Sequence, residues 1–157
     1  MGGRLHLLRQ AKTLILLEPQ VKFIDQSPVY ETEPVGVKPE HKAMKFLNAV
    51  LIVESPYTAE EWLAKIKKIE QTLHRVRTED RNAPRTMDVD ILFSGDQVVD
   101  SDILKVPHAR WADRRFVVQP LADVRPELVL PGTKNPVQKI LAEMPDNDDV
   151  RLFSVKW

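Results

Sequence analysis

The stretch HRVRTEDRNAPRTMDVDILF, His74–Phe93, places four arginines a few residues before two aspartates. Its last seven residues, Met87–Phe93, alternate apolar and acidic side chains, which is typical of a β-strand with one buried face. In such a strand Asp88 and Asp90 point to the same side, about 7 Å apart, because two residues rise by about 3.3 Å each. The stretch therefore predicts a strand with an acidic pair on its open face.

The spacing of the acidic pair suits divalent cations. Two Mg²⁺ ions bridged by such carboxylates would lie about 4 Å apart, as in two-metal phosphoryl-transfer sites, and Mg²⁺ prefers oxygen ligands and retained waters. An Asp-x-Asp pattern on the solvent face of a half-buried strand is also common without any function. The neighbouring arginines favour the functional interpretation, with a metal-bound triphosphate as the ligand.

The arginines supply the cationic half of the predicted site. Arg75, Arg77, Arg81 and Arg85 can each form forked hydrogen bonds to phosphate oxygens and keep their charge at any physiological pH. An arginine-rich loop alone would indicate only a solvated surface or a weak nucleic-acid patch. Its position directly before the acidic pair predicts a polyphosphate site.

Several stretches resemble the 6-hydroxymethyl-7,8-dihydropterin pyrophosphokinases of folate biosynthesis. The strongest are Arg75–Arg77, followed by Asn82–Leu92, which reads NAPRTMDVDIL. The resemblance continues in the family's order through Tyr30–Gly36, Phe46–Val50, Val106–His108 and Arg114–Val117. It covers nearly the whole chain.

This resemblance implies a reaction and a set of site residues. The reaction would transfer a pyrophosphoryl group from ATP to the hydroxymethyl oxygen of the reduced pterin and release AMP. Asp88 and Asp90 would hold two Mg²⁺ ions, and Arg75 and Arg85 would contact the transferring phosphates. The implied nucleotide-binding residues are Glu70, Arg77, Ile91, His108 and Arg114, and the implied pterin-binding residues are Thr32, Val35, Phe46, Asn48 and Phe116.

The chain also departs from the family pattern. Asn82 stands where many relatives place tryptophan, Phe46 where tyrosine is frequent, and Glu33 where proline is frequent. Relatives open with a strand that ends in a G-S-N-x-G turn, and this chain opens at Met1-Gly2-Gly3. We therefore expect a ferredoxin-like sheet whose first strand lies upstream or is replaced by another segment, such as Val150–Trp157, or by a second chain. With that strand restored, a monomer is expected.

Composition narrows the class of protein. A length of 157 residues predicts one domain, residues 1–157. Lysine plus arginine and aspartate plus glutamate number 23 each, so no net field attracts nucleic acid or an anionic membrane. Cysteine is absent, which excludes disulfides, thiolate metal ligands and cysteine nucleophiles. No apolar run reaches the length of a membrane span, and we expect a cytoplasmic protein.

Periodicity predicts an α+β fold with an antiparallel-rich sheet covered by helices. A capping box at Thr58–Glu61 predicts the start of a long helix, whose apolar stripe would be Trp62, Ile66, Ile69, Leu73 and Val76. Asn135-Pro136 predicts the start of a later helix, with Asn135 as N-cap. The remaining expectations are a helix over 4–17, a strand over 21–30 broken at Ser27-Pro28, a strand over 44–53, a hairpin partner at 97–99 for the acidic strand, a helical core at 116–121, and a closing strand or extended tail at 150–157.

Two other functions stay open on the residues alone. A nucleotidyltransferase uses a similar Asp-x-Asp pair but attacks the α-phosphorus, so it would release pyrophosphate rather than AMP. A ferredoxin-like nucleic-acid-binding module could use the same arginines, but it would need exposed aromatic residues among basic ones on a sheet face. Only 6% of the residues are aromatic, and most lie on apolar stripes.

Overall fold

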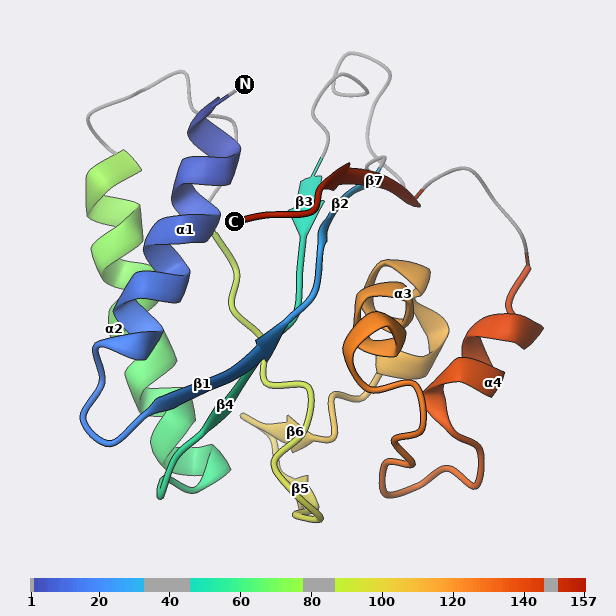
Figure 1. The fold of residues 1–157 in the computed structure, drawn as a ribbon. Helices are drawn as coiled ribbons and strands as arrows, with labels where there is room; N and C mark the ends of the chain where they lie inside the picture. The colour runs from blue at the N-terminus through green and yellow to red at the C-terminus, as the bar shows by residue number, and fades with distance from the viewer. Residues whose placement is uncertain (1, 33–45, 78–86, 146–149) are drawn as a thin grey trace. The chain divides into compact units, whose positions relative to one another are not determined.

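The computed structural model describes residues 2–32, 46–77, 87–145 and 150–157 (Figure 1). Within these ranges the chain is α+β, with four α-helices and small sheets. The chain divides into two compact units. Unit 1 comprises Met1–Ile24 and Val53–Ala109, and unit 2 comprises Asp25–Ile52 and Arg110–Trp157.

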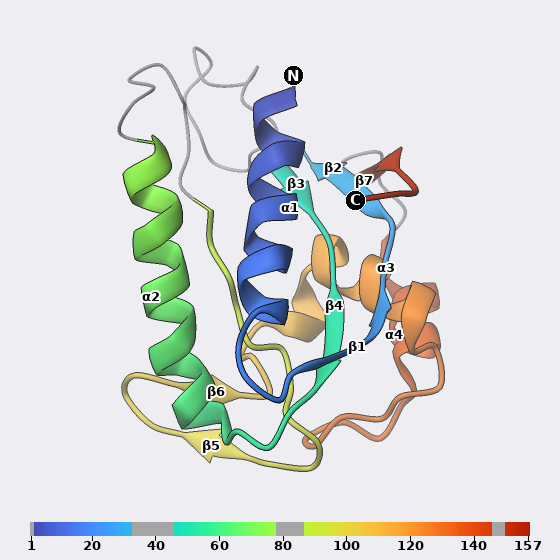
Figure 2. The ribbon, with the colours of Figure 1, turned by 60° about the vertical axis from the view of Figure 1, so that its left-hand side comes forward.

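Two long helices form the core of unit 1. Helix α1 (Gly2–Leu16) packs along α2 (Ala59–Arg77), as both views show (Figures 1 and 2). Their buried contact is made by Ala11, Ile69 and Leu73. The partly buried side chains around it are Leu7, Leu14, Ile15, Met87 and Val89. The predicted helix over 4–17 and the apolar stripe of the second helix are thus confirmed in the described residues.

The predicted capping box sets the start of α2. The Thr58 hydroxyl accepts a hydrogen bond from the Glu61 amide at 3.1 Å, and the Glu61 carboxylate accepts from the Thr58 amide at 2.9 Å. Two amides that the first helical turn leaves without partners are satisfied in this way. A cap of this kind contributes about 1 kcal/mol to stability.

The predicted strand at 87–93 is wrong as secondary structure. Residues 87–94 form no strand among the described residues, and β5 (Val99–Asp100) pairs with β6 (Lys105–Val106) instead of with this segment. The Ser94–Gln97 turn does form, through a 2.9 Å hydrogen bond from the Gln97 amide to the Ser94 carbonyl. The apolar side chains of residues 87–94 are partly buried, and the Val89 amide donates to the Glu70 carboxylate instead of to a neighbouring strand.

Unit 2 contains a three-stranded antiparallel sheet in the order β3-β2-β7. Strand β2 (Val29–Thr32) lies between β3 (Phe46–Asn48) and β7 (Val150–Ser154), with Thr32 opposite both Phe46 and Val150. The tail therefore forms the closing strand, one of its two predicted conformations. It pairs with β2.

Both long predicted strands are interrupted at matching points. Strand β1 (Lys22–Gln26) ends before Ser27, and residues 49–50 separate β3 from β4 (Leu51–Glu54), which pairs with β1. At the break, the Ser27 amide donates to the Val50 carbonyl at 2.9 Å, and the Val50 amide donates to the Ser27 hydroxyl at 2.8 Å. The break at Ser27-Pro28 was predicted, whereas the single strand over 44–53 was wrong because Val50 bonds partly to a side chain.

Helices α3 (Arg115–Val124) and α4 (Val137–Glu143) pack together in unit 2, as both ribbon views show. Val118 and Leu121 are fully buried, which confirms the predicted helical core. The N-cap of α4 is Pro136 rather than Asn135, and no side chain caps that end. No α-helix in the described ranges has both the length and the apolar character needed to cross a membrane.

Candidate active site

The acidic segment of unit 1 keeps the predicted alternation of faces although it is not a strand. Asp88 and Asp90 are exposed, whereas Met87 and Val89 are partly buried against the core between α1 and α2. Ile91 packs on a second cluster around Ala59, Leu104 and Val106. Burial of the apolar residues on one side therefore leaves both carboxylates on the other.

One hydrogen bond ties this segment to α2. The Glu70 carboxylate accepts from the Val89 amide at 2.7 Å, so it lies beside the residue that separates the two aspartates. Burial raises the pKa of Glu70; the bond from Val89 opposes this rise, and the charges of Asp88 and Asp90 add to it. Three carboxylates thus share one small region of negative potential.

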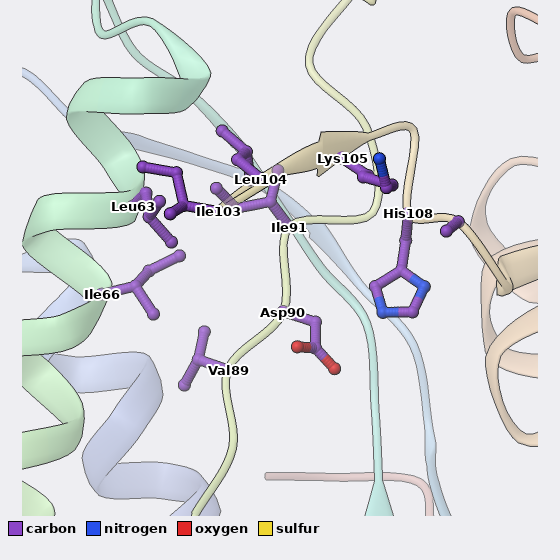
Figure 3. A pocket seen from close by; sticks show the side chains of 10 residues that line it. Leu63, Ile66, Val89, Asp90, Ile91, Ile103, Leu104, Lys105 and His108 are labelled. Atoms are coloured by element: carbon purple, nitrogen blue, oxygen red, sulfur yellow. The ribbon is translucent and has the colours of Figure 1, made fainter. Parts of the chain in front are cut away.

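A pocket of about 240 Å³ opens beside the acidic segment, entirely within unit 1 (Figure 3). Figure 3 shows Val89 directed toward Ile66 on α2, and Asp90 turned to the other side, where His108 also projects. The His108 amide donates to the Leu92 carbonyl at 2.9 Å, which fixes the backbone that carries the imidazole. The lining residues are Leu63, Ile66, Val89, Asp90, Ile91, Ile103, Leu104, Lys105, His108 and Ala109.

The donor set fits a divalent cation that also binds a substrate. No group of three or more metal-ligating side chains occurs in the described part of the chain. A pair of exposed carboxylates nevertheless suits Mg²⁺, which is usually held by one or two carboxylates and completes its shell with water and phosphate oxygens. Asp88 and Asp90 could therefore hold such an ion, with water or phosphate oxygens as its remaining ligands.

Several predicted residues fall outside what the structure describes. Arg81, Arg85 and Val35 lie outside the described residues. Arg75 and Arg77 belong to the last turn of α2, and only their backbone is described. Their roles stay predictions.

Unit 2 brings together the described residues predicted to bind the pterin. Asn48 on β3 donates through its side-chain amide to the Thr32 hydroxyl at 3.0 Å, and Thr32 is buried. Phe46 faces Thr32 across the ladder, and Phe116 lies in the first turn of α3, which packs against β2 and β3. The Asn48 amide therefore has a side-chain partner, and the two phenylalanines belong to elements that contact each other.

Arg114 precedes α3 in the same unit. It is the N-cap residue of the helix, and its guanidinium lies 5.7 Å from the centroid of the Phe116 ring, within the range of a cation–π contact. The structure places this arginine beside a residue predicted to bind the pterin.

A polar network missed by the sequence analysis fastens β2 to α3. The Tyr30 hydroxyl donates to the Asp123 carboxylate, which also accepts from the Gln119 side chain at 3.3 Å. Burial, the hydrogen bond to Asp123 and the negative charge of Asp123 together raise the pKa of Tyr30 to about 12. The only sequence signal for this network is the spacing of Gln119 and Asp123, four residues apart on one helix.

Alkaline titration tests this network. Because the folded pKa of Tyr30 lies above its ordinary value of 10.0, the stability it contributes is complete below pH 10 and is lost as the pH rises toward 12. The chain has two tyrosines, so in Tyr57→Phe protein the tyrosinate absorbance reports Tyr30 alone. We expect a midpoint near 12 in the folded protein and near 10 after denaturation. A folded midpoint at the ordinary value, or one unchanged by Asp123→Asn, would contradict the network.

The apolar wall of the pocket was also missed. Ile66 was predicted only as part of a helix stripe, and Leu63, Ile103 and Lys105 were not singled out. A helix stripe does not reveal which of its members border an open pocket, because that depends on the loops that pack against it.

A family sequence model and individual known proteins both match this chain, and they point to the same family. The sequence model of the 7,8-dihydro-6-hydroxymethylpterin-pyrophosphokinase family matches residues 1–126. The chain is 35% identical over 127 residues to the 2-amino-4-hydroxy-6-hydroxymethyldihydropteridine pyrophosphokinase of Pseudomonas aeruginosa, covering 81% of this chain and 75% of that protein. It is 36% identical over 124 residues to the protein of the same name from Bacillus subtilis, covering 79% and 72%.

A longer protein is also similar. The folic acid synthesis protein fol1 of Schizosaccharomyces pombe is 32% identical over 154 residues, which cover 98% of this chain. The chain spans about a fifth of the length of that relative, since the match covers 20% of it.

Proposed function

Because the chain belongs to the 7,8-dihydro-6-hydroxymethylpterin-pyrophosphokinase family, we propose that it transfers pyrophosphate from Mg-ATP to 6-hydroxymethyl-7,8-dihydropterin in folate biosynthesis. The hydroxymethyl oxygen attacks the β-phosphorus, the bond from that phosphorus to the oxygen of the α-phosphate breaks, and AMP leaves. The hydroxyl proton passes to solvent. The products are AMP and the pterin diphosphate.

The observation that carries this proposal is the outward-facing carboxylate pair beside a pocket. Asp88 and Asp90 are exposed, and Asp90, Ile91 and His108 line the same pocket. We assign the two aspartates to two Mg²⁺ ions, which would neutralise the triphosphate and orient the attacking hydroxyl. Catalysis then depends on positioning and charge stabilisation, without a covalent intermediate.

The pocket suits the nucleotide. Apolar side chains from α2 and from residues 103–104 can cover the faces of a flat base, and polar groups at one side can fix its orientation. We assign ATP binding to Glu70, Arg77, Ile91, His108 and Arg114. Arg75 and Arg85 are assigned to the transferring phosphates, as catalytic residues.

The Thr32–Asn48 pair suits the pterin. An amide and a hydroxyl held by a 3.0 Å hydrogen bond can read the polar edge of a heterocycle, and aromatic rings can stack on its faces. We assign pterin binding to Thr32, Val35, Phe46, Asn48 and Phe116.

We further infer the wider properties of the protein. Residues 1–157 would act as one catalytic domain with a ferredoxin-like core, in the cytoplasm. Equal numbers of acidic and basic residues, 23 each, support small-molecule substrates rather than nucleic acid as ligands.

Product analysis tests the reaction. The full chain is incubated with Mg-ATP and 6-hydroxymethyl-7,8-dihydropterin, and the nucleotides are separated. We expect AMP in equal amount to the pterin diphosphate. Release of free pyrophosphate, with the nucleotide joined to the pterin through its α-phosphate, would identify a nucleotidyltransferase instead.

A further inference from the structure

The backbone between the two aspartates has an unusual support. Extended segments inside a protein normally satisfy their amides by pairing with neighbouring strands. Residues 87–94 have no such ladder in the described part of the chain, and the Val89 amide donates instead to the Glu70 carboxylate at 2.7 Å. At this position a side chain of α2 accepts the amide hydrogen bond that the backbone of a neighbouring strand would accept in a sheet.

The hydrogen bond between Val89 and Glu70 constrains the orientation of the neighbouring Asp88 and Asp90 side chains. The Val89 amide belongs to the peptide unit that joins residue 88 to residue 89, and Asp90 follows directly. Val89 itself is held in the core of α1 and α2 by its apolar side chain. With both the amide and the side chain of Val89 fixed, the directions in which Asp88 and Asp90 leave the backbone are fixed as well.

The bond to Val89 uses one side-chain oxygen of Glu70 as its acceptor. The neutral amide oxygen of a glutamine could perform the same task, because it is also a hydrogen-bond acceptor.

We propose that Glu70 is a positioning residue for the divalent-cation site, acting through the Val89 amide to align the carboxylates of Asp88 and Asp90. This rests on the proposed function only in that the aspartates bind the cation. It adds a role for Glu70 separate from any contact with the nucleotide. Partners that orient metal ligands typically change metal affinity by about 10- to 100-fold when removed.

Two variants separate the hydrogen bond from the charge. Glu70→Gln keeps an oxygen that can accept from the Val89 amide, and Glu70→Ala removes it. Glu60→Ala is the matched control, because Glu60 is a carboxylate of the same helix that accepts from the Gln97 side chain at 3.0 Å on the exposed surface. Thermal melting of all three establishes that each is folded.

The probe is Mn²⁺ alone, titrated into the full chain while the amide signals of residues 88–90 are followed by nuclear magnetic resonance. We expect paramagnetic broadening at these amides in the unaltered protein, and about a tenfold or greater loss of Mn²⁺ affinity in Glu70→Ala. The Mn²⁺ affinities of Glu70→Gln and Glu60→Ala should stay within about threefold of that of the unaltered protein, because both variants keep a side-chain oxygen at residue 70 that can accept from the Val89 amide.

Three outcomes would overturn the proposal: no broadening at residues 88–90 in the unaltered protein, normal Mn²⁺ affinity in Glu70→Ala, or equal losses in Glu70→Gln and Glu70→Ala. The titration uses neither ATP nor pterin. A protein that fails to form AMP but shows the expected Mn²⁺ pattern would refute the proposed reaction and leave the role of Glu70 standing.

Discussion

Asp90→Ala and Asp88→Ala are each expected to lower kcat by about 10²-fold or more, since loss of one group that stabilises transition-state charge typically has an effect of this size. Both carboxylates are exposed, and an exposed acidic pair contributes little to folding. The melting temperature should therefore stay close to that of the unaltered protein. Turnover and circular dichroism melting, measured on the same preparations, check both parts.

Asp102→Ala is the control for this prediction. Asp102 is an exposed aspartate of the same unit, outside the pocket lining, so its removal changes the net charge equally without touching the proposed site. It should retain normal turnover. Near-normal turnover in Asp88→Ala or Asp90→Ala at saturating Mg²⁺ would contradict the assignment of these aspartates as Mg²⁺ ligands.

Leu73→Ala is expected to lower the free energy of unfolding by about 3 kcal/mol, the usual cost of removing a fully buried leucine side chain. Leu73 is 1% exposed and lies in the cluster between α1 and α2. Met87 and Val89 pack on the same cluster, so the cavity would also loosen the support of the acidic segment. Urea unfolding followed by tryptophan fluorescence measures the loss.

Leu17→Ala is the matched control for Leu73→Ala. It makes the same chemical change at a side chain that is 71% exposed, just after α1, and should change stability by less than about 0.5 kcal/mol. Equal unfolding midpoints for the two variants would show that the α1–α2 contact is not a core.

Local sequence signals predicted the helical parts well. The capping box at Thr58 and Glu61 forms as expected because its two hydrogen bonds involve only residues within one helical turn. The apolar stripe of α2 was correct for the same reason, since helical periodicity places its members on one face whatever packs against them.

Strand pairing was predicted less well, because a ladder depends on a distant partner. The alternation in Met87–Phe93 correctly gave the faces of Asp88 and Asp90, but it could not show that Val89 bonds to Glu70. Likewise, nothing in Leu51 or its neighbours indicates that Ser27 would interrupt the strand at Val50.

In the candidate site, too, local features were predicted and contacts between distant segments were not. Residue types and spacing identified the acidic pair, whereas Thr32 and Asn48 were predicted from the family resemblance; the structure places these two residues in contact. The apolar lining of the pocket and the pair of Tyr30 with Asp123 were not predicted, because each joins segments far apart in the chain.

The pairing of β2 with β7 has a consequence for the order of folding. Val29 lies opposite Ser154, so this ladder closes a loop that spans most of the chain. Closing a long loop costs chain entropy before any contact repays it, and structures rich in distant contacts form slowly. During synthesis β2 emerges before β7, and the two strands can pair only after the residues between them have been made. Helices α1 and α2 both precede β7 in the chain, so they can pack together before the sheet of unit 2 is complete.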